Sequence, residues 1–536
     1  MPSFDKSIAA KIRSLLARKP MLGLPTYVRF PLIADWESEL YGQLDTMQIE
    51  LDQTRHENEI LRVDIGKLRT ENVQLRTKDE KLGTENEKLK ITIAKLSKNS
   101  ANSSKPSSSD IVKPKSQRKA KKGKRAIGAQ HGHPRHERVP WPSDATDATH
   151  DYHLATCPEC DGKVIPTGGK PKVMQQVELP VMPVVRHEHR SHPFWCAKCN
   201  KVHYMDFPDE VVREGLFKAH LTALVAYMKN VCHASYSTIW KFIRDVLHEK
   251  VSRGYLRKVV EKVGHALDVT YQELLDRLPL ETNLNIDETG GKENGNRFWI
   301  WVFKADLYVL FKIDKSRGSK VLIDVLGEEF IGTIGCDYFS AYRKFMRDFG
   351  VTIQFCLAHL IRDVRFLTSL PDVESKAYGK RLLEAVKNLF KVIHESDGMT
   401  PEALTGGLET AKAAIMAAAL ENIPSKLDKD GKELKREVAN MVKRFRDNGE
   451  AYFTFITTPG MDPTNNVAEQ AIRFVVIDRL VTQGTRSAKG RHTNERLWTV
   501  IATCALQGRS AYNFMLKAVE AYFRSEPAPS LLTNTV

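Results

Sequence analysis

Leucines recur at seven-residue intervals through the first hundred residues of the chain. They are Leu61, Leu68, Leu75, Leu82, Leu89 and Leu96, and Leu40, Met47 and Thr54 continue the register towards the N-terminus. This spacing places the side chains on one seam of a helix, as the d positions of a coiled coil. Asn58, Asn72 and Asn86 fall at a positions, where a buried Asn is satisfied best by its equivalent in a parallel two-stranded coil. The pattern predicts a leucine-zipper coiled coil over residues 36–98 and a homodimer or larger assembly, because a single solvated helix would not explain the unbroken leucines.

Short apolar runs rich in β-branched and aromatic residues, typical of strands, fill residues 281–370. The runs are LNIDETG, RFWIWVFKAD, LYVLFKID, TIGCDYFSAY and VTIQFCLAH, with helix-like stretches after the third and the fourth. The order βββ-α-β-α-β is that of an RNase H-like, retroviral-integrase-like sheet in a multidomain α+β protein. Residues 371–455 have helical periodicity and no strand signal, which predicts an all-helical insertion before residues 456–515 complete the core. Residues 516–536 are expected to form a C-terminal tail.

Three amphipathic helices are predicted within residues 211–280, from apolar residues at three- and four-residue spacing. Ser235 and Ser252 stand where helix N-caps are expected. The last two helices have the pattern of a helix-turn-helix. Its second helix would present to DNA the residues Arg253, Tyr255, Arg257 and Lys258. Packing of three helices without DNA contact explains the same pattern, and both interpretations stay open.

Two CxxC pairs lie within residues 143–210, Cys157 with Cys160 and Cys196 with Cys199. Each pair places two thiolates on a tight turn, and together they can complete a tetrahedral, structural Zn²⁺ site. The segment between the pairs alternates and is rich in Val and Pro, as in the strands of a zinc ribbon. A redox function needs a single CxxC beside a βαβ unit, so we interpret these cysteines as a four-cysteine zinc-binding domain.

Lys and Arg outnumber Asp and Glu by 81 to 66, and the net charge of +15 favours a polyanionic partner. Residues 99–142 are rich in Ser, Lys, Pro and Gly, which predicts a basic disordered linker. The linker serves as a solvated tether or binds DNA phosphates through Lys121, Lys122 and Arg125, and the two roles are compatible. Residues 1–35 indicate no function.

Neither a signal peptide nor a membrane span is predicted. The first thirty residues lack an apolar core, and no stretch of eighteen apolar residues occurs. The cysteine spacing does not form a disulfide framework. We therefore expect a soluble, reduced, cytoplasmic protein that associates with the nucleoid of a bacterium and not with a membrane.

Three acidic residues stand where predicted elements end or begin. Asp287 and Asp337 close strands, and Glu469 lies on a helix that Asp462 or Thr464 would cap. Phosphodiester cleavage uses two Mg²⁺ or Mn²⁺ ions about 4 Å apart. Such hard ions choose oxygen ligands, so three carboxylates suit them and imidazoles or thiolates do not. The three acids therefore predict a two-metal site, with Asp287 best placed to bridge both ions.

Two further acids and one arginine belong to this prediction. Arg473 lies four residues after Glu469 on the same helix face, where it would steady Glu469 or hold a phosphate. Glu288 and Asp314 are rival candidates for the metal-binding acids. Alternation along a strand points Glu288 to the face opposite Asp287, and Asp314 ends a strand of unknown depth.

The motifs NIDET, CDYFSAY, CLAHLIRD and TNNVAEQAIR resemble those of the insertion-sequence-66 family of bacterial transposases. The resemblance extends over nearly all of residues 36–510. It implies a DDE transposase whose catalytic triad is Asp287, Asp337 and Glu469, with the paired cysteines as its zinc site. His359 and Arg362 match the family's CxAHxxR element, which implies a supporting or DNA-contacting role, although a buried structural His explains His359 equally well. Asn466 and Arg473 are further supporting residues on the helix of Glu469.

A transposase of this kind binds the terminal inverted repeats of its element and then target DNA. Hydrolysis at the element's end exposes a 3′-hydroxyl, which attacks target DNA in a transesterification without a covalent protein intermediate. Accessory proteins encoded by the same element are further possible partners. Two other functions remain open: a non-enzymatic zinc and coiled-coil DNA-binding regulator, and an RNase H-like nuclease that cuts DNA without strand transfer.

Overall fold

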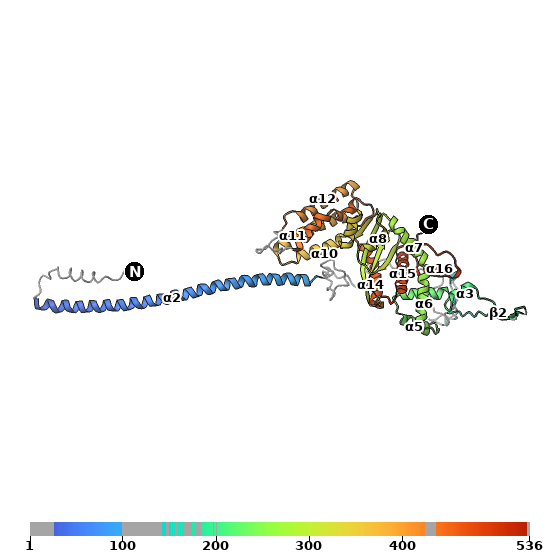
Figure 1. Cartoon of the computed structure of the whole chain (residues 1–536), viewed down its shortest axis with the longest axis horizontal. Helices are drawn as coiled ribbons and strands as arrows, with labels where there is room; N and C mark the ends of the chain where they lie inside the picture. Colours follow the sequence, from blue (N-terminus) through green and yellow to red (C-terminus); the bar gives the residue numbers. More distant parts are fainter. Residues whose placement is uncertain are drawn as a thin grey trace. The chain divides into compact units, whose positions relative to one another are not determined.

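The chain forms two compact units, residues 1–95 and residues 96–536 (Figure 1). The computed structural model describes residues 26–98, 201–423 and 436–532 and parts of the stretch 142–199. Within the described residues, no helix combines the length and the apolar character needed to cross a membrane.

In the part of the first unit that the structure describes lies one helix, α2 (Thr26–Leu96), whose 71 residues extend over about 110 Å. The prediction of a helix over the heptads is confirmed, although the helix begins before residue 36. Its seam leucines face solvent within this unit, since Leu68, Leu75 and Leu82 are 62%, 57% and 64% exposed. An apolar seam of this kind is stable when a second helix covers it. The parallel pairing itself stays a prediction.

Several predicted residues lie outside the described part of the chain. They are Lys121, Lys122, Arg125, Cys157 and Cys160. The second cysteine pair belongs to a hairpin in which β1 (Pro193–Cys196) pairs antiparallel with β2 (Lys201–Tyr204). Cys199 lies in the turn between these strands, with its Sγ 3.0 Å from His203 Nε2. Two strands thus flank the second CxxC motif, and the four-cysteine site remains a prediction.

A group of helices precedes the sheet. It contains α3 (Asp209–Glu214), α4 (Ala219–Asn230), α5 (Tyr236–Asp245), α6 (Arg253–Ala266) and α7 (Asp268–Arg277). Both predicted N-caps are confirmed, because Ser235 Oγ accepts from Thr238 N at 3.0 Å and Ser252 Oγ accepts from Tyr255 N at 3.1 Å. The last long helix, α16 (Ala511–Arg524), packs against α4 and α6. It therefore crosses the predicted start of a C-terminal tail at residue 516.

The five-stranded sheet has the predicted order of elements. Its strands are β3 (Asn283–Glu293), β4 (Asn296–Lys304), β5 (Val309–Asp314), β6 (Thr333–Cys336) and β7 (Thr352–Phe355). They lie in the order β5-β4-β3-β6-β7, antiparallel from β5 to β3 and parallel from β3 to β7. The connecting helices are α8 (Lys320–Leu326) and α9 (Ser340–Phe349). The order βββ-α-β-α-β is confirmed, and β3 is the central strand.

Helices complete the core and form the predicted insertion. They are α10 (Leu357–Thr368), α11 (Val373–His394), α12 (Pro401–Leu420), α13 (Arg436–Asn448), α14 (Asn466–Thr482) and α15 (Ala488–Leu506). Between β7 and α14 the described residues contain helices and turns but no strand, as the sequence predicts. Ala468, Ile472 and Val475 of α14 pack with apolar side chains of β4 and β5, so the position of α14 is set by the core of the sheet.

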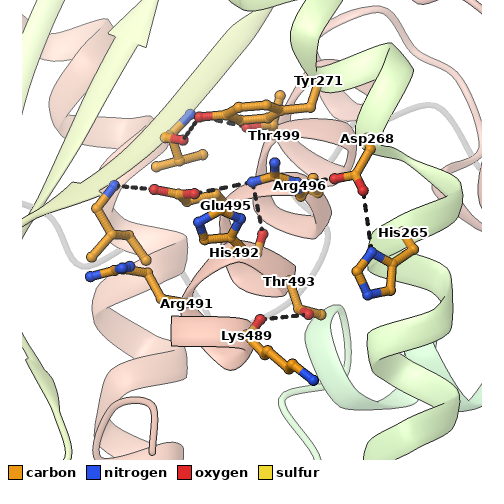
Figure 2. A network of polar contacts seen from close by, with 12 residues as sticks. His265, Asp268, Tyr271, Lys489, Arg491, His492, Thr493, Glu495, Arg496 and Thr499 are labelled. Atoms are coloured by element: carbon orange, nitrogen blue, oxygen red, sulfur yellow. Dashed lines mark hydrogen bonds and ion pairs between the residues drawn. The ribbon is translucent and has the colours of Figure 1, made fainter. Parts of the chain in front are cut away.

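The outer edge of β5 is covered by side chains of α15 (Figure 2). Three of these side chains accept hydrogen bonds from backbone N–H groups of the strand. Glu495 Oε1 accepts from Ile313 N at 2.7 Å, Thr499 Oγ1 from Phe311 N at 3.0 Å and Thr503 Oγ1 from Val309 N at 3.1 Å. Four residues of a helix rise about 6 Å and two residues of a strand about 6.6 Å, so the two spacings match. The sheet thus ends here without open backbone donors at these positions.

Candidate active site

Two predicted acids lie at the same level of neighbouring strands. The parallel pairing of β3 with β6 ends where Asn285 faces Gly335. Asp287 and Asp337 each follow two residues later, so both carboxylates lie just beyond the end of this pairing. A Cβ at Gly335 would collide with the side-chain amide of Asn285. A larger residue here would therefore have to displace the amide that bonds to Asn465.

Both aspartates are oriented by backbone N–H groups. Asp287 Oδ1 accepts from Glu288 N, and Asp337 Oδ1 accepts from Phe339 N, each at 2.9 Å. The second bond closes a tight turn at the end of β6, immediately before α9. Each aspartate uses one oxygen in this way, which leaves the other for a ligand.

Glu469 lies in the first turn of α14, and Asn465 joins this turn to β3. The side chain of Asn465 is 1% exposed. Its Nδ2 donates to Ile286 O at 2.7 Å, and its Oδ1 accepts from Asn285 Nδ2 at 3.0 Å. Asn465 O accepts from Glu469 N at 3.2 Å and so begins the helix. A residue next to Asp287 on β3 is therefore connected directly to the helix turn that carries Glu469.

The sequence prediction was wrong about the cap of this helix. Asn465 holds the N-cap position, and its side chain bonds across to β3 instead of capping α14. Asp462 Oδ1 accepts from Thr464 N at 2.6 Å, so these two residues form a local turn. Asn466, predicted as a supporting residue, is the first residue of α14. The polar run before the helix was a signal that one Asn had a role, but it did not distinguish Asn465 from its neighbour.

The side-chain cation that pairs with Glu469 is an arginine of α10. Arg362 Nη2 donates to Glu469 Oε1 at 3.0 Å. Among the described residues, Arg362 and not Arg473 forms an ion pair with Glu469, and Arg473 is exposed. The structure thus gives Glu469 a partner other than Arg473, and the role of Arg473 in steadying Glu469 or holding a phosphate stays a prediction. The supporting position expected for Arg362 agrees with this contact.

His359 and Cys356 complete this side of the site. His359 is buried, and its Nδ1 lies 3.6 Å from Glu469 Oε1. Burial and then the charge of Arg362 lower the pKa of His359, against the opposite effect of Asp337 and Glu469. Cys356, His359 and Glu469 offer ligand atoms within 4.8 Å of one another. Burial raises the pKa of Cys356 to about 11, and its Sγ accepts from Asn465 N at 3.1 Å.

The three predicted acids share one electrostatic environment. The pKa of Asp287 is raised well above its usual range, first by burial and then by the charges of Glu288 and Asp337. Glu469 contributes to the same increase. The charges of these acids thus act on one another, although among the described residues their ligand atoms do not all lie within 4.8 Å of one another, as those of Cys356, His359 and Glu469 do. The site therefore concentrates negative charge that a bound cation would neutralise.

Glu288 differs from Asp287 in its partners. Its side chain is 1% exposed and lies against α9, where it accepts from Tyr342 Oη at 2.6 Å and from Arg317 Nη2 at 2.7 Å. Burial and then the charge of Asp337 raise the pKa of Glu288 to about 7, against the effect of Arg317. Asn285 and Asp287 lie on the opposite face of β3, which Asn465 contacts. Asp314, the other rival, ends β5 and accepts from Ser316 N at 2.7 Å, two strands away from β3.

The predicted DNA-binding residues of α6 differ in their surroundings. Arg253, Arg257 and Lys258 are exposed. Arg257 forms an ion pair with Glu261 in the next turn of the same helix. Tyr255 is half-buried, and its Oη accepts from Phe217 N at 3.2 Å. The contact of Tyr255 is explained by packing, so the exposed basic residues are the part of this prediction that remains suited to DNA.

Comparisons with known proteins agree with the sequence motifs. A family model described as "Transposase IS66 family" matches residues 214–493, more than half of the chain. A second, described as a family of unknown function (DUF6444), matches residues 51–139. The uncharacterized protein y4qI of Sinorhizobium fredii (strain NBRC 101917 / NGR234) is 22% identical over 350 residues. That match covers 60% of this chain and 63% of y4qI, so the chain spans less than two thirds of its relative.

A solved structure of the Mos1 transposase catalytic domain with raltegravir and Mg also matches. It is 13% identical, and the match covers 37% of this chain and 94% of that chain with a TM-score of 0.12. At this TM-score the likeness carries no argument. The family match rests instead on a continuous region that begins before α4 and ends within α15 and includes all three acids. Because that match spans more than half of its length, this chain belongs to the IS66 family of transposases.

Proposed function

We propose that this chain is a DDE transposase that cleaves DNA at the ends of its element and joins them to target DNA. The observation that carries the proposal is the placement of the three acids: Asp287 on the central strand β3, Asp337 directly after the neighbouring β6, and Glu469 in the first turn of α14, which Asn465 joins to β3. The mixed sheet with two parallel strands beside the central one supports an RNase H-like core.

The donor set suits hard divalent cations. Asp287, Asp337 and Glu469 supply carboxylate oxygens, which Mg²⁺ and Mn²⁺ prefer. Burial, then the charge of Glu288, and then those of Asp337 and Glu469 raise the pKa of Asp287, and a bound cation would offset these effects. Two such cations would activate the attacking oxygen and stabilise the leaving oxygen of an in-line displacement.

The protein's own contribution is to orient these acids before DNA arrives. Backbone N–H groups hold one oxygen of each aspartate, and Arg362 holds Glu469. Water would attack the phosphodiester at the element's end and release a 3′-hydroxyl. That hydroxyl would then attack a phosphodiester of target DNA and displace its 3′-oxygen, so no bond to the protein forms.

The remaining parts of the chain would bring DNA and a second subunit to this core. The exposed basic residues of α6 and the linker residues Lys121, Lys122 and Arg125 would bind phosphates. The leucine seam of α2 would form a parallel homodimer that holds two element ends. Zn²⁺ held by the four paired cysteines would stabilise the hairpin region without taking part in the reaction.

A cleavage and strand-transfer assay tests the proposal. The substrate is duplex DNA with the element's own ends, the cation is Mg²⁺, and the variants are Asp287→Asn, Asp337→Asn and Glu469→Gln. Each variant keeps the shape of its side chain and should lose on the order of 10³-fold in rate, about 4 kcal/mol of transition-state stabilisation, while DNA binding is retained.

Asp314→Asn is the matched control, because Asp314 also ends a strand but lies at the sheet edge. It should cut and join DNA as the unmodified chain does. Cleavage without joining would support a nuclease instead, and binding without cleavage would support a regulator. Full activity of the three triad variants would reject these residues as the catalytic acids.

A further inference from the structure

A buried arginine of the helical insertion lies next to the candidate active site. Arg444 of α13 is 9% exposed. Its Nη1 donates to Asp363 Oδ2 at 2.8 Å, and its Nε donates to Tyr452 Oη. Its guanidinium carbon lies 4.0 Å from the centroid of the Tyr338 ring. This side chain belongs to the insertion, but two of its three partners belong to the core.

Tyr338 connects Arg444 to the second acid. It follows Asp337 directly, inside the turn that the Asp337 carboxylate closes with Phe339 N. The Oη of Tyr338 accepts from Asn448 Nδ2 of α13 at 2.8 Å, while its ring packs against Phe355 of β7 with centroids 4.8 Å apart. Two residues of α13, one turn apart, therefore hold the side chain that adjoins Asp337.

Asp363 connects Arg444 to the third acid. Asp363 and Arg362 are consecutive residues of α10, and Arg362 makes the ion pair with Glu469. Arg444 fixes Asp363 at 2.8 Å, which restricts the turn of α10 from which Arg362 extends. The buried guanidinium of Arg444 thus lies between Tyr338, which follows Asp337, and Asp363, which follows Arg362. Arg362 in turn pairs with Glu469.

The geometry requires an arginine. A planar guanidinium can stack on the Tyr338 ring while its edge donates to Asp363 and Tyr452, whereas an ammonium cannot do both. Among the described residues, Arg444 Nη2 is buried without a hydrogen-bond partner. Its charge is therefore balanced by Asp363 and by the aromatic faces around it, so the contact with Tyr338 contributes to holding the cation.

We propose that Arg444 is a positioning residue through which α13 sets the relative placement of Asp337 and Glu469 for divalent cation binding. The inference rests on the proposed two-cation function of those acids. Arg444 touches neither carboxylate. It acts through Tyr338 on one side and through Asp363 and Arg362 on the other, so the helical insertion becomes part of the active-site framework.

The test measures Mn²⁺ binding by the full chain bound to end DNA, using isothermal titration calorimetry, alongside the unfolding temperature and DNA affinity. Arg444→Lys should weaken Mn²⁺ binding by on the order of tenfold, as expected when a residue that orients metal ligands is changed. Asn448→Ala removes one hydrogen bond to Tyr338 and should shift Mn²⁺ binding in the same direction by a smaller factor. DNA affinity should stay the same in both variants.

Arg381→Lys is the matched control within the insertion. Arg381 of α11 also lies over a tyrosine, Tyr378 at 5.4 Å, and its Nη2 donates to Glu421 O at 2.8 Å. This variant should lower the unfolding temperature but leave Mn²⁺ affinity unchanged. Since Asn448→Ala removes only a half-buried amide, it keeps the test decisive if Arg444→Lys does not fold.

The outcomes separate the two proposals. If Arg444→Lys or Asn448→Ala lowers stability while Mn²⁺ affinity stays that of the unmodified chain, the positioning role is overturned and the arginine is only structural. If the unmodified chain does not bind Mn²⁺, or if Asp287→Asn does not reduce its Mn²⁺ binding, the two-cation function itself fails. This inference then fails with it. Weaker Mn²⁺ binding in both variants, with Arg381→Lys unaffected, supports the positioning role.

Discussion

Replacing Asn465 by Ala removes the side chain that joins the start of α14 to β3. In the protein this amide donates to Ile286 O at 2.7 Å and accepts from Asn285 Nδ2 at 3.0 Å. The pairing of β3 with β6 has ended one residue earlier, at Asn285, so the Asn465 amide takes the place of a strand partner. The variant therefore loosens the helix turn of Glu469 from the strand of Asp287.

The cost follows from the groups that lose their partners. Asn465 is 1% exposed, and a buried polar group without a partner costs about 1–3 kcal/mol, so two such groups cost about 2–6 kcal/mol. Asn285→Ala leaves only Asn465 Oδ1 without its partner and keeps Ile286 O paired, so it should cost about 1–3 kcal/mol. In the double variant the two effects overlap, and we expect a coupling energy of about 1 kcal/mol.

The rate of catalysis should fall together with stability. A displacement of Glu469 by about 1 Å is expected to lower the cleavage rate by about 100-fold, while Asn285→Ala lowers it by about tenfold or less. The assay is single-turnover cleavage of end DNA in Mg²⁺, with urea unfolding of the same four proteins as a double-mutant cycle. If Asn465→Ala loses stability but cleaves within about threefold of the unmodified rate, the anchor does not set Glu469 and the reasoning is refuted.

Two further predictions concern other parts of the chain. Thr499→Val leaves Phe311 N without its acceptor and should lower the free energy of unfolding by about 1–3 kcal/mol. Thr499→Ser is the control, because it keeps the hydroxyl that accepts this bond. Equal unfolding temperatures for the two variants would contradict the prediction. Leu75→Asp on the α2 seam should convert the proposed dimer to a monomer in sedimentation experiments, while Thr77→Asp, two residues on and off the seam, should not. A dimer that survives Leu75→Asp would reject the coiled-coil interface.

Local patterns predicted the sheet and its acids because each depends on short stretches of chain. Apolar runs bounded by polar residues predict strands, and the order of five runs with two helices between them leaves few topologies. Asp287 and Asp337 were then expected at neighbouring strand ends. Asp337 does follow the end of β6, but the expectation was wrong for Asp287, because β3 continues to Glu293 and only its pairing with β6 ends before Asp287. Ser235 and Ser252 were predicted as N-caps for the same reason, since a cap and its helix are adjacent in sequence.

Local sequence patterns could not predict side-chain contacts between segments that are far apart in the sequence. Helical spacing favoured Arg473 as the partner of Glu469, but an i,i+4 pair stabilises a helix by only about 0.2–0.5 kcal/mol and is easily replaced. The observed partner, Arg362, comes from another helix 107 residues earlier in the chain. Asn465 and Asn285 are separated by 180 residues, and no pattern near either one indicates the other.

The partners of neighbouring acids separate structural from catalytic candidates. Glu288 is more buried than Asp287, yet it has Arg317 and Tyr342 to hold it. Among the described residues, neither Asp287 nor Asp337 forms an ion pair with a side-chain cation, and each relies on a backbone N–H. A buried carboxylate without a counter-charge is costly in a folded protein. A bound cation would relieve this cost, which favours Asp287 over its neighbour Glu288 as a proposed metal ligand. The argument separates only these two neighbours, because the third proposed ligand, Glu469, is paired with Arg362.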